Sequence, residues 1–390
     1  MTNIKESSPV YIPYIPDDVL LNCLARVSRL YYPTLSLVSK RFRSLVASLD
    51  LYDIRTFLGR TENCLYVCIL FGSELIPRWF TLSRRPTRIR KLNSRWFGSC
   101  FRPYRVLTNP PTIMKEEKKS SDINLMVSIP PRSLAPPLEL TRIAIGSNIY
   151  LGCIDNNGAF TSRFFFMDCR SHTLHEVPST RVARKYIHMK VLDGKVYVVE
   201  GSKDPDYSNL IEFFDTKTLI WEHVPSPSVE IGYVSECLVF NRKLYLFGDK
   251  IMVYKPTENK WDDVGLEMPL HWVPSYLCCV VDNIIYSYGK NGVLCWYDSQ
   301  GRSWKLLKGL EKLPKLPEDY TCVRLVEYGE KIAVLWEKKV CGLDNKKIWC
   351  AAIALEKGNG QTIYGKIEWC DVVLTVPKSS FIWEFTTVNV

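Results

Sequence analysis

Along most of the chain, apolar and polar residues alternate over short runs, a pattern that predicts β-strands rather than helices. From about residue 57 onward, four segments repeat one order of predicted elements. Each segment has an apolar strand, a turn, a strand containing a tyrosine, a loop of variable length, and then two more strands. The tyrosines Tyr150, Tyr197, Tyr245 and Tyr286 are 47, 48 and 41 residues apart. The chain therefore contains internal repeats of 40 to 50 residues.

A second, shorter interval recurs inside these repeats, between the end of the third strand and the start of the fourth. The two positions are always six residues apart and are occupied by Asp168 and Leu174, Asp215 and Trp221, Lys255 and Trp261, and Asp298 and Trp304. Four strands in a period of this length predict the blade of a β-propeller. We expect the tryptophan to pack between neighbouring blades and the aspartate to cap the hairpin between the third and fourth strands.

The predicted fold is therefore mainly β, a propeller of about six four-stranded blades. The blade-like units lie near residues 57–131, 141–178, 188–225, 235–264, 276–307 and 320–370, and the first of them holds a basic insertion near 83–122. The first and last units are weaker matches, so five or seven blades stay possible from the sequence. The final segments, VVLTV and FIWEFTTV, are both candidates for the strand that closes the ring.

Residues 10–50 carry a different pattern, because their apolar residues recur at the spacing of helices. Pro16 followed by Asp17 and Asp18 is a favourable helix start, since proline fits the first turn and carboxylates favour the positive end of the helix dipole. Pro33 can begin a second short helix, and SKRFRSLVASL a third. Three short helices bury little surface by themselves, so this unit is expected to complete its core against a partner or against the following domain.

This segment resembles the F-box, whose pattern is Leu-Pro-x-acidic, an apolar helix, and then Val-x-Lys-x-aromatic. Ile15-Pro16 and Asp18 match the first part of the pattern, and Val38, Lys40 and Phe42 match the second. Ile15 replaces the usual leucine and Phe42 the commoner tryptophan, and both keep apolar bulk. The resemblance implies that a Skp-type adaptor, which links to a cullin–RING scaffold, binds at Ile15, Pro16, Asp18, Leu20, Leu24, Val38, Lys40 and Phe42. A helical cap that serves only the ring is the alternative.

The repeats resemble kelch repeats with degenerate glycine pairs, and the whole chain is similar to the plant family of F-box/kelch-repeat proteins. The resemblance implies the substrate-recognition subunit of an SCF-type ubiquitin ligase, in which the F-box docks the adaptor and the propeller holds an unidentified target for ubiquitination. Such a subunit is not an enzyme, so no catalytic residue is expected. The alternative is an interaction scaffold or a nucleic-acid-associated protein that acts outside a ligase.

Loop lengths point to one rim of the propeller for target binding. The turn between the third and fourth strands keeps its length, whereas the loop after the second strand varies from almost nothing to about nine residues. Variable loops on a constant scaffold are the usual recognition surface. The candidate target contacts are Asn157, Asp204, Asp206 and Tyr207. The other interpretation is that these loops are simply tolerated surface segments.

The net charge of +10 changes this picture at one place only. No acidic residue occurs between Glu74 and Glu116, while arginines interleave with aromatic residues from Arg78 to Arg105. Such a mixture can bind single-stranded nucleic acid, but a solvated insertion or a protein-docking patch fits it better, so nucleic acid is not an expected partner. Fourteen cysteines without a CxxC pair and five histidines favour neither a metal site nor a cofactor. Without an apolar signal or membrane segment, a cytoplasmic or nuclear location is expected.

Overall fold

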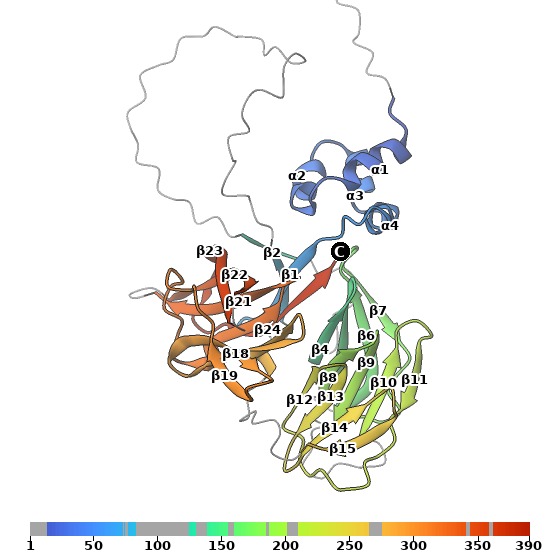
Figure 1. The fold of residues 1–390 in the computed structure, drawn as a ribbon. Helices are drawn as coiled ribbons and strands as arrows, with labels where there is room; N and C mark the ends of the chain where they lie inside the picture. Colours follow the sequence, from blue (N-terminus) through green and yellow to red (C-terminus); the bar gives the residue numbers. More distant parts are fainter. Residues whose placement is uncertain are drawn as a thin grey trace, which may run out of the picture.

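The computed structural model describes residues 14–72, 74, 77–82, 125–129, 139–154, 160–184, 187–200, 210–264, 275–340, 344–358 and 362–390. Six four-stranded sheets form a β-propeller, and a group of short helices precedes it (Figure 1). The prediction of a mainly β propeller with six blades and an N-terminal helical unit is confirmed.

The helical unit contains one more helix than the sequence pattern predicts. Its members are α1 (Asp17–Ala25), the 3₁₀ turn η1 (Arg29–Tyr31), α2 (Tyr32–Leu35), α3 (Lys40–Val46) and α4 (Leu49–Phe57). Ser39 caps α3 by accepting a hydrogen bond from the Phe42 N–H at 3.1 Å, and Ser48 caps α4 by accepting one from the Leu51 N–H at 3.4 Å. Serine is a strong N-cap because its hydroxyl accepts from an otherwise unpaired helix N–H. The third predicted helix, SKRFRSLVASL, corresponds to α3, and α4 is the helix that the sequence pattern did not predict.

In each blade the strands run up and down in chain order, except in the first. Blade 1 has the order β24-β1-β2-β3, from β24 (Phe381–Asn389), β1 (Asn63–Leu70), β2 (Arg78–Leu82) and β3 (Met126–Ser128). Blade 2 is β4 (Glu139–Ile145), β5 (Asn148–Ile154), β6 (Phe160–Asp168) and β7 (Thr173–Val177). Blade 3 is β8 (Ile187–Leu192), β9 (Lys195–Glu200), β10 (Ile211–Asp215) and β11 (Ile220–His223).

The remaining blades repeat this arrangement. Blade 4 is β12 (Glu236–Phe240), β13 (Lys243–Phe247), β14 (Ile251–Lys255) and β15 (Lys260–Asp263). Blade 5 is β16 (Cys278–Val281), β17 (Ile284–Gly289), β18 (Val293–Asp298) and β19 (Ser303–Leu306). Blade 6 is β20 (Val323–Glu327), β21 (Lys331–Lys339), β22 (Asn345–Lys357) and β23 (Ile363–Pro377).

Ring closure depends on β24, which comes from the far end of the sequence and pairs along the whole of β1, from Asn63 with Asn389 to Leu70 with Phe381. Closure in this way completes the four-stranded sheet of blade 1, with β24 as its inner strand. Of the two candidate segments, FIWEFTTV forms this strand, whereas VVLTV lies within β23 of blade 6. The basic insertion falls between β2 and β3 of blade 1, and residues 83–124 lie outside the described part of the chain.

The recurring tryptophans join neighbouring blades. Trp221 of blade 3 packs edge-on against Phe164 of blade 2 with ring centroids 5.0 Å apart, and its indole N–H donates to the Pro178 carbonyl at 2.7 Å. Trp261 of blade 4 makes the equivalent bond to the Pro225 carbonyl at 2.6 Å. The predicted packing between blades is therefore confirmed.

The recurring aspartates cap the turns as predicted. The Asp215 carboxylate accepts from the Lys217 N–H at 2.9 Å, and the Asp298 carboxylate accepts from the Gln300 N–H at 3.1 Å. The turns before the tyrosine strands use left-handed residues, among them Asp193, Asn241 and Asp282. Tight hairpins need positive φ at these positions, which aspartate and asparagine tolerate better than most residues.

Candidate protein-docking surfaces

The helical unit keeps a group of large apolar side chains in solvent. Ile15 and Val19 are each 46% exposed, Val38 is 64% exposed and Leu37 is 77% exposed. The same unit already buries Leu21, Leu24, Leu45 and Leu51 in its own core. An exposed apolar cluster beside a completed core indicates a surface that another protein covers.

Arg41 holds the two halves of this apolar surface together. Its guanidinium donates to the Asp17 carboxylate at 2.7 Å, hydrogen-bonds the Ile15 carbonyl, and lies 4.3 Å from the centre of the Tyr14 ring. The start of α3 is thereby tied to the segment that enters α1. Val38, two residues before α3, and Ile15 thus belong to one surface. Arg41 was not identified from the sequence, where it reads as one basic residue on a solvated helix face.

The structure divides the predicted adaptor-binding residues into three groups. Ile15, Pro16, Asp18, Val38 and Lys40 are exposed. Leu20 and Phe42 are partly buried against the core of the helical unit. Leu24 is only 4% exposed, because it shares the inner face of α1 with Leu21 and Ala25. Its side chain therefore supports the fold rather than the surface.

The helical unit and the ring share one hydrophobic core. A single cluster of buried residues contains Leu24, Leu45 and Tyr52 from the helices together with Trp79 and Phe165 from blades 1 and 2. The N-terminal unit is therefore packed on the propeller and is not an independent domain joined only by a linker.

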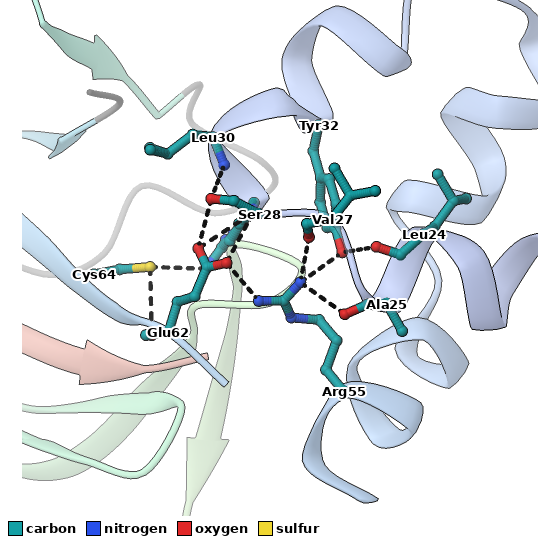
Figure 2. Close-up of polar contacts among 10 residues, drawn as sticks. Leu24, Ala25, Val27, Ser28, Leu30, Tyr32, Arg55, Glu62 and Cys64 are labelled. Carbon is teal, nitrogen blue, oxygen red and sulfur yellow. Dashed lines mark hydrogen bonds and ion pairs between the residues drawn. The ribbon is translucent and has the colours of Figure 1, made fainter. Parts of the chain in front are cut away.

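A buried arginine, Arg55 of α4, lies at the centre of this junction (Figure 2). Its guanidinium donates to the Val27 carbonyl at 2.7 Å, to the Ala25 carbonyl at 3.3 Å and to the Tyr32 hydroxyl at 3.0 Å. It also forms an ion pair with the Glu62 carboxylate at 2.9 Å. Arg55 thus binds the end of α1 and the start of α2 to the residue that precedes β1.

Arg29 makes a second junction, with blade 2. Its guanidinium donates to the Cys169 carbonyl at 2.6 Å and lies 5.5 Å from the centre of the Tyr52 ring. The same carbonyl accepts a hydrogen bond from the Tyr66 hydroxyl of β1 at 3.2 Å. Cys169 belongs to the turn between β6 and β7, so the helices sit at the end of the ring where the third-to-fourth strand turns lie.

A cleft of about 990 Å³ lies between the helical unit and the ring. Pro33, Ser36 and Val46 line it on the helical side. On the ring side it is lined by Leu82, Val127, Tyr328 and Trp369 of blades 1 and 6 and by Arg170, Ser171 and His172 of blade 2. The helical unit therefore packs on blades 1 and 2 beside an open cleft.

The opposite end of the ring carries the connections between the second and third strands. The predicted target contacts Asn157, Asp204, Asp206 and Tyr207 all lie outside the described residues. In an up-and-down blade these connections leave from the strand ends opposite the third-to-fourth strand turns. The described strand ends beside these connections lie at the end of the ring away from the helices.

Aromatic residues gather around the inner strands at that opposite end. Trp383 is 42% exposed, and it occupies a bulge of β24, since Ile382 pairs with Ile69 and Glu384 pairs with Cys68. A bulge redirects the side chain of the extra residue. Arg324 of β20 donates to the Ile382 carbonyl at 3.1 Å and to the Thr321 carbonyl at 2.7 Å, which ties the strand that carries Trp383 to the turn that carries the half-exposed Tyr320. Sequence reasoning missed this group, because only the pairing of β24 with β1 places it.

Charged residues of four inner strands meet in the same region. Lys190 of β8 interacts electrostatically with Glu236 of β12 and Glu384 of β24, and Glu384 also interacts with Arg324 of β20. Burial raises the pKa of Glu384. His188, Glu236 and Cys237 come close enough to share a metal ion, with the His188 Nδ1 3.6 Å from a Glu236 oxygen. The Lys190 ammonium already lies 4.0 Å from that oxygen, so the group is better described as a paired charge cluster.

The aromatic residues at the start of the basic segment do not form a stacking platform. Trp79 and Phe80 lie in β2 and are 9% and 7% exposed, and Arg78 is paired with Glu74 at 2.7 Å. Residues 83–105 of the segment fall outside the described part of the chain. Within the described residues, no helix is long and apolar enough to cross a membrane.

Comparisons with known proteins agree with this division of the chain. A family model described as F-box domain matches residues 12–54, and one described as FKB95, Kelch-repeats domain, matches residues 79–374. An Arabidopsis thaliana protein described as an F-box/kelch-repeat protein is 63% identical over 390 residues, which covers 98% of this chain and 99% of the relative. A second such protein from the same plant is 59% identical over the full length of both chains. A third is 45% identical and covers 94% of this chain and 91% of its own length.

Proposed function

The chain belongs to the family of F-box/kelch-repeat proteins, and from this premise we propose that it is the substrate-recognition subunit of an SCF-type ubiquitin ligase. The helical unit binds a Skp-type adaptor, and through the adaptor a cullin–RING scaffold. The propeller binds a target protein at the end of the ring that faces away from the helices. The chain itself does no chemistry and acts by bringing the target close to the conjugating enzyme. A cytoplasmic or nuclear location goes with this role.

One observation carries the proposal: the apolar surface formed by Ile15, Val19, Leu37 and Val38 is exposed although the core beneath it is complete. These side chains lie outside the core of the helical unit, and their exposure costs solubility unless a partner covers them. They lie within the residues that match the F-box domain. The surface therefore supports adaptor binding rather than a helical cap that serves only the ring.

On the propeller, the proposed target surface combines two parts. One is the rim of variable loops with Asn157, Asp204, Asp206 and Tyr207. The other is the aromatic group around Trp383 and Tyr320 at the inner strands. Tryptophan and tyrosine are frequent energetic centres of protein interfaces, because each buries a large area at a small cost in conformational entropy.

The adaptor-binding prediction is tested by placing a charge on the exposed surface. We expect Val38→Asp to weaken the affinity for a purified Skp-type adaptor by about 30-fold, the effect of losing an interface hot spot of about 2 kcal/mol. Val38 is 64% exposed, so the substitution leaves the core intact. Isothermal titration calorimetry of the full chain measures the change.

The matched control is Val229→Asp, which charges a 42% exposed valine on the ring, far from the helices, and is expected to leave adaptor affinity within about twofold. Absence of adaptor binding by the unmodified chain would contradict the proposed function. Equal losses in both variants would show that Val38 is not part of the adaptor surface.

A further inference from the structure

We infer that Glu62 is a positioning residue, which couples closure of the propeller ring to the placement of the adaptor-binding helices. Glu62 lies between α4 and β1 and contacts three parts of the molecule at once: α4, the turn that follows α1, and the end of β24. The inference deepens the proposed function, on which its consequence for ubiquitin transfer rests.

The side chain of Glu62 binds the helical unit at two places. One carboxylate oxygen pairs with the buried guanidinium of Arg55 at 2.9 Å. The carboxylate also accepts hydrogen bonds from the Ser28 hydroxyl at 3.2 Å and from the Arg29 N–H at 3.2 and 3.3 Å. These bonds hold the turn between α1 and η1 against α4 (Figure 2).

The backbone of Glu62 belongs to the ring. Its N–H donates to the Val390 carbonyl at 2.7 Å, and its carbonyl accepts from the Val390 N–H at 2.9 Å. This pair continues the β1–β24 ladder that closes the propeller, one residue beyond the pairing of Asn63 with Asn389. A shift of β24 would therefore move the backbone of the residue whose carboxylate holds the helices.

The Glu62 contacts lie beside an open cleft, which gives them their importance. Arg29 anchors the helices to blade 2 through the Cys169 carbonyl, and a shared apolar core joins them to blades 1 and 2. The cleft of about 990 Å³ nevertheless leaves space between the helices and the ring, and beside it Glu62 ties the turn after α1 to α4 and to the end of β24. Loosening the Glu62 contacts would allow the helices to tilt into the cleft without unfolding.

In a ligase, this tilt sets where the target lies relative to the conjugating enzyme. A loosened junction leaves adaptor binding and target binding separately intact, because Glu62 belongs to neither proposed surface. It lowers the rate of ubiquitin transfer and spreads it over more lysines, since proximity and orientation are no longer fixed.

Hydrogen exchange of the full chain without partners tests the coupling directly. In Glu62→Gln, which keeps the size of the side chain but removes its charge, we expect exchange of residues 25–31 and of Val390 to accelerate together by about tenfold or more, because the buried Arg55 guanidinium loses its charged partner. Glu368→Gln is the matched control, because Glu368 lines the same cleft in an ion pair with Lys331 at 2.8 Å but contacts no helix in this way. Its exchange at both sites should equal that of the unmodified chain.

A second variant separates the two sides of the junction and serves if Glu62→Gln does not fold. Arg55→Lys keeps a positive charge near Glu62 but loses the planar fork that reaches several acceptors. We expect faster exchange in residues 25–31 and unchanged exchange at Val390. Unchanged exchange in residues 25–31 in the variants that fold, or acceleration without any response at Val390 in Glu62→Gln, would overturn the inference.

Ubiquitin transfer in a reconstituted adaptor–cullin–RING assembly gives the functional readout. For Glu62→Gln we expect adaptor affinity within about twofold of the unmodified chain, and lysine sites of self-ubiquitination that are more widely distributed over the ring. A parallel loss of adaptor affinity would show that Glu62 only supports folding and would overturn the positioning role. If the unmodified chain binds no adaptor, the proposed function fails, while the exchange experiment still decides the coupling.

Discussion

At the scale of single residues, the chain uses a few polar side chains to fix turns and junctions. Asp168 shows how far the sequence predicts such a role. Its position in the repeat predicts a turn cap, and its carboxylate does accept from the Arg170 N–H at 2.8 Å. The structure adds that the Arg170 guanidinium bonds the same carboxylate at 2.9 Å and lies 3.7 Å from Asp53 of α4. A turn residue of blade 2 thereby also faces the helices.

This environment predicts how stability depends on pH. Burial alone would raise the pKa of Asp168, but the hydrogen bonds and the charge of Arg170 outweigh it and lower that pKa. The carboxylate therefore stabilises the fold above the pKa of an unfolded aspartate, about 3.9, and this contribution is lost as the pH falls through the lower folded pKa. We expect Asp168→Asn to reduce the free energy of unfolding by about 1–2 kcal/mol at pH 7 and by clearly less near pH 3.

Urea unfolding at the two pH values measures this difference. Asp344→Asn is the control, because Asp344 is fully exposed and its nearest cation is 4.0 Å away. It should change stability at neither pH. A loss in Asp168→Asn that persists undiminished at low pH would mean that the carboxylate charge is not responsible.

At the scale of elements, a recurring tryptophan joins neighbouring blades. Its indole ring packs against one blade, and its N–H donates a hydrogen bond to a proline carbonyl. Trp221 is 6% exposed and contacts both Phe164 and Phe214, whereas Trp261 makes its bond to Pro225 while only partly buried. The hydrogen bond is thus common to both tryptophans and the extent of burial differs.

The difference predicts unequal effects of two equivalent substitutions. Trp221→Ala should reduce the free energy of unfolding by about 3–5 kcal/mol, because it empties a closed site between two blades. Trp261→Ala should cost roughly half as much, since less apolar area leaves water when this ring packs. Equilibrium unfolding in urea compares the two variants, and equal losses would indicate that the hydrogen bond rather than burial dominates.

The elements also show which features of the fold a local sequence pattern predicts and which it misses. Local alternation and turn residues gave the four complete repeats correctly, because a blade is folded from neighbouring segments. The same analysis ended the helical unit near residue 49 and so missed α4, which continues to Phe57. It also left the last strand of blade 6 at about residue 370, whereas β23 continues to Pro377 in a long pairing with β22.

At the scale of the whole molecule, closure by β24 is the step on which the ring and the placement of the helices both depend. The partners Cys64 of β1 and Val388 of β24 lie directly opposite each other in the ladder, and their side chains belong to the same core cluster. Opposite residues in antiparallel strands have Cα atoms about 4.5–5.5 Å apart, which lies within the range of disulfides.

The pairing predicts that the ring can be locked covalently with one substitution. In Val388→Cys, oxidation to Cys64 should raise the free energy of unfolding by about 2–4 kcal/mol relative to the reduced form, because the crosslink closes a very long loop in the unfolded chain. Thermal unfolding with and without reductant measures the gain, and Val388→Ala, which has no thiol to crosslink, should show no dependence on reductant. If the disulfide forms but the free energy of unfolding does not rise, we would conclude that β24 stays paired with β1 in the unfolding transition.

The sequence by itself determined the repeats, the turns, the tryptophan and aspartate positions and the F-box, because these depend on residues within one blade or one helix. The tertiary structure alone decided which segment closes the ring, how Arg55 and Glu62 join the helices to it, and where the bulge of β24 places Trp383. Ring closure depends on the pairing of β1 with β24, which are more than 300 residues apart in the sequence. The other features depend on how separate strands and helices pack together. A charged residue such as Glu62 has the same local pattern whether it is solvated or bonded to a buried arginine, and only the packed molecule distinguishes the two.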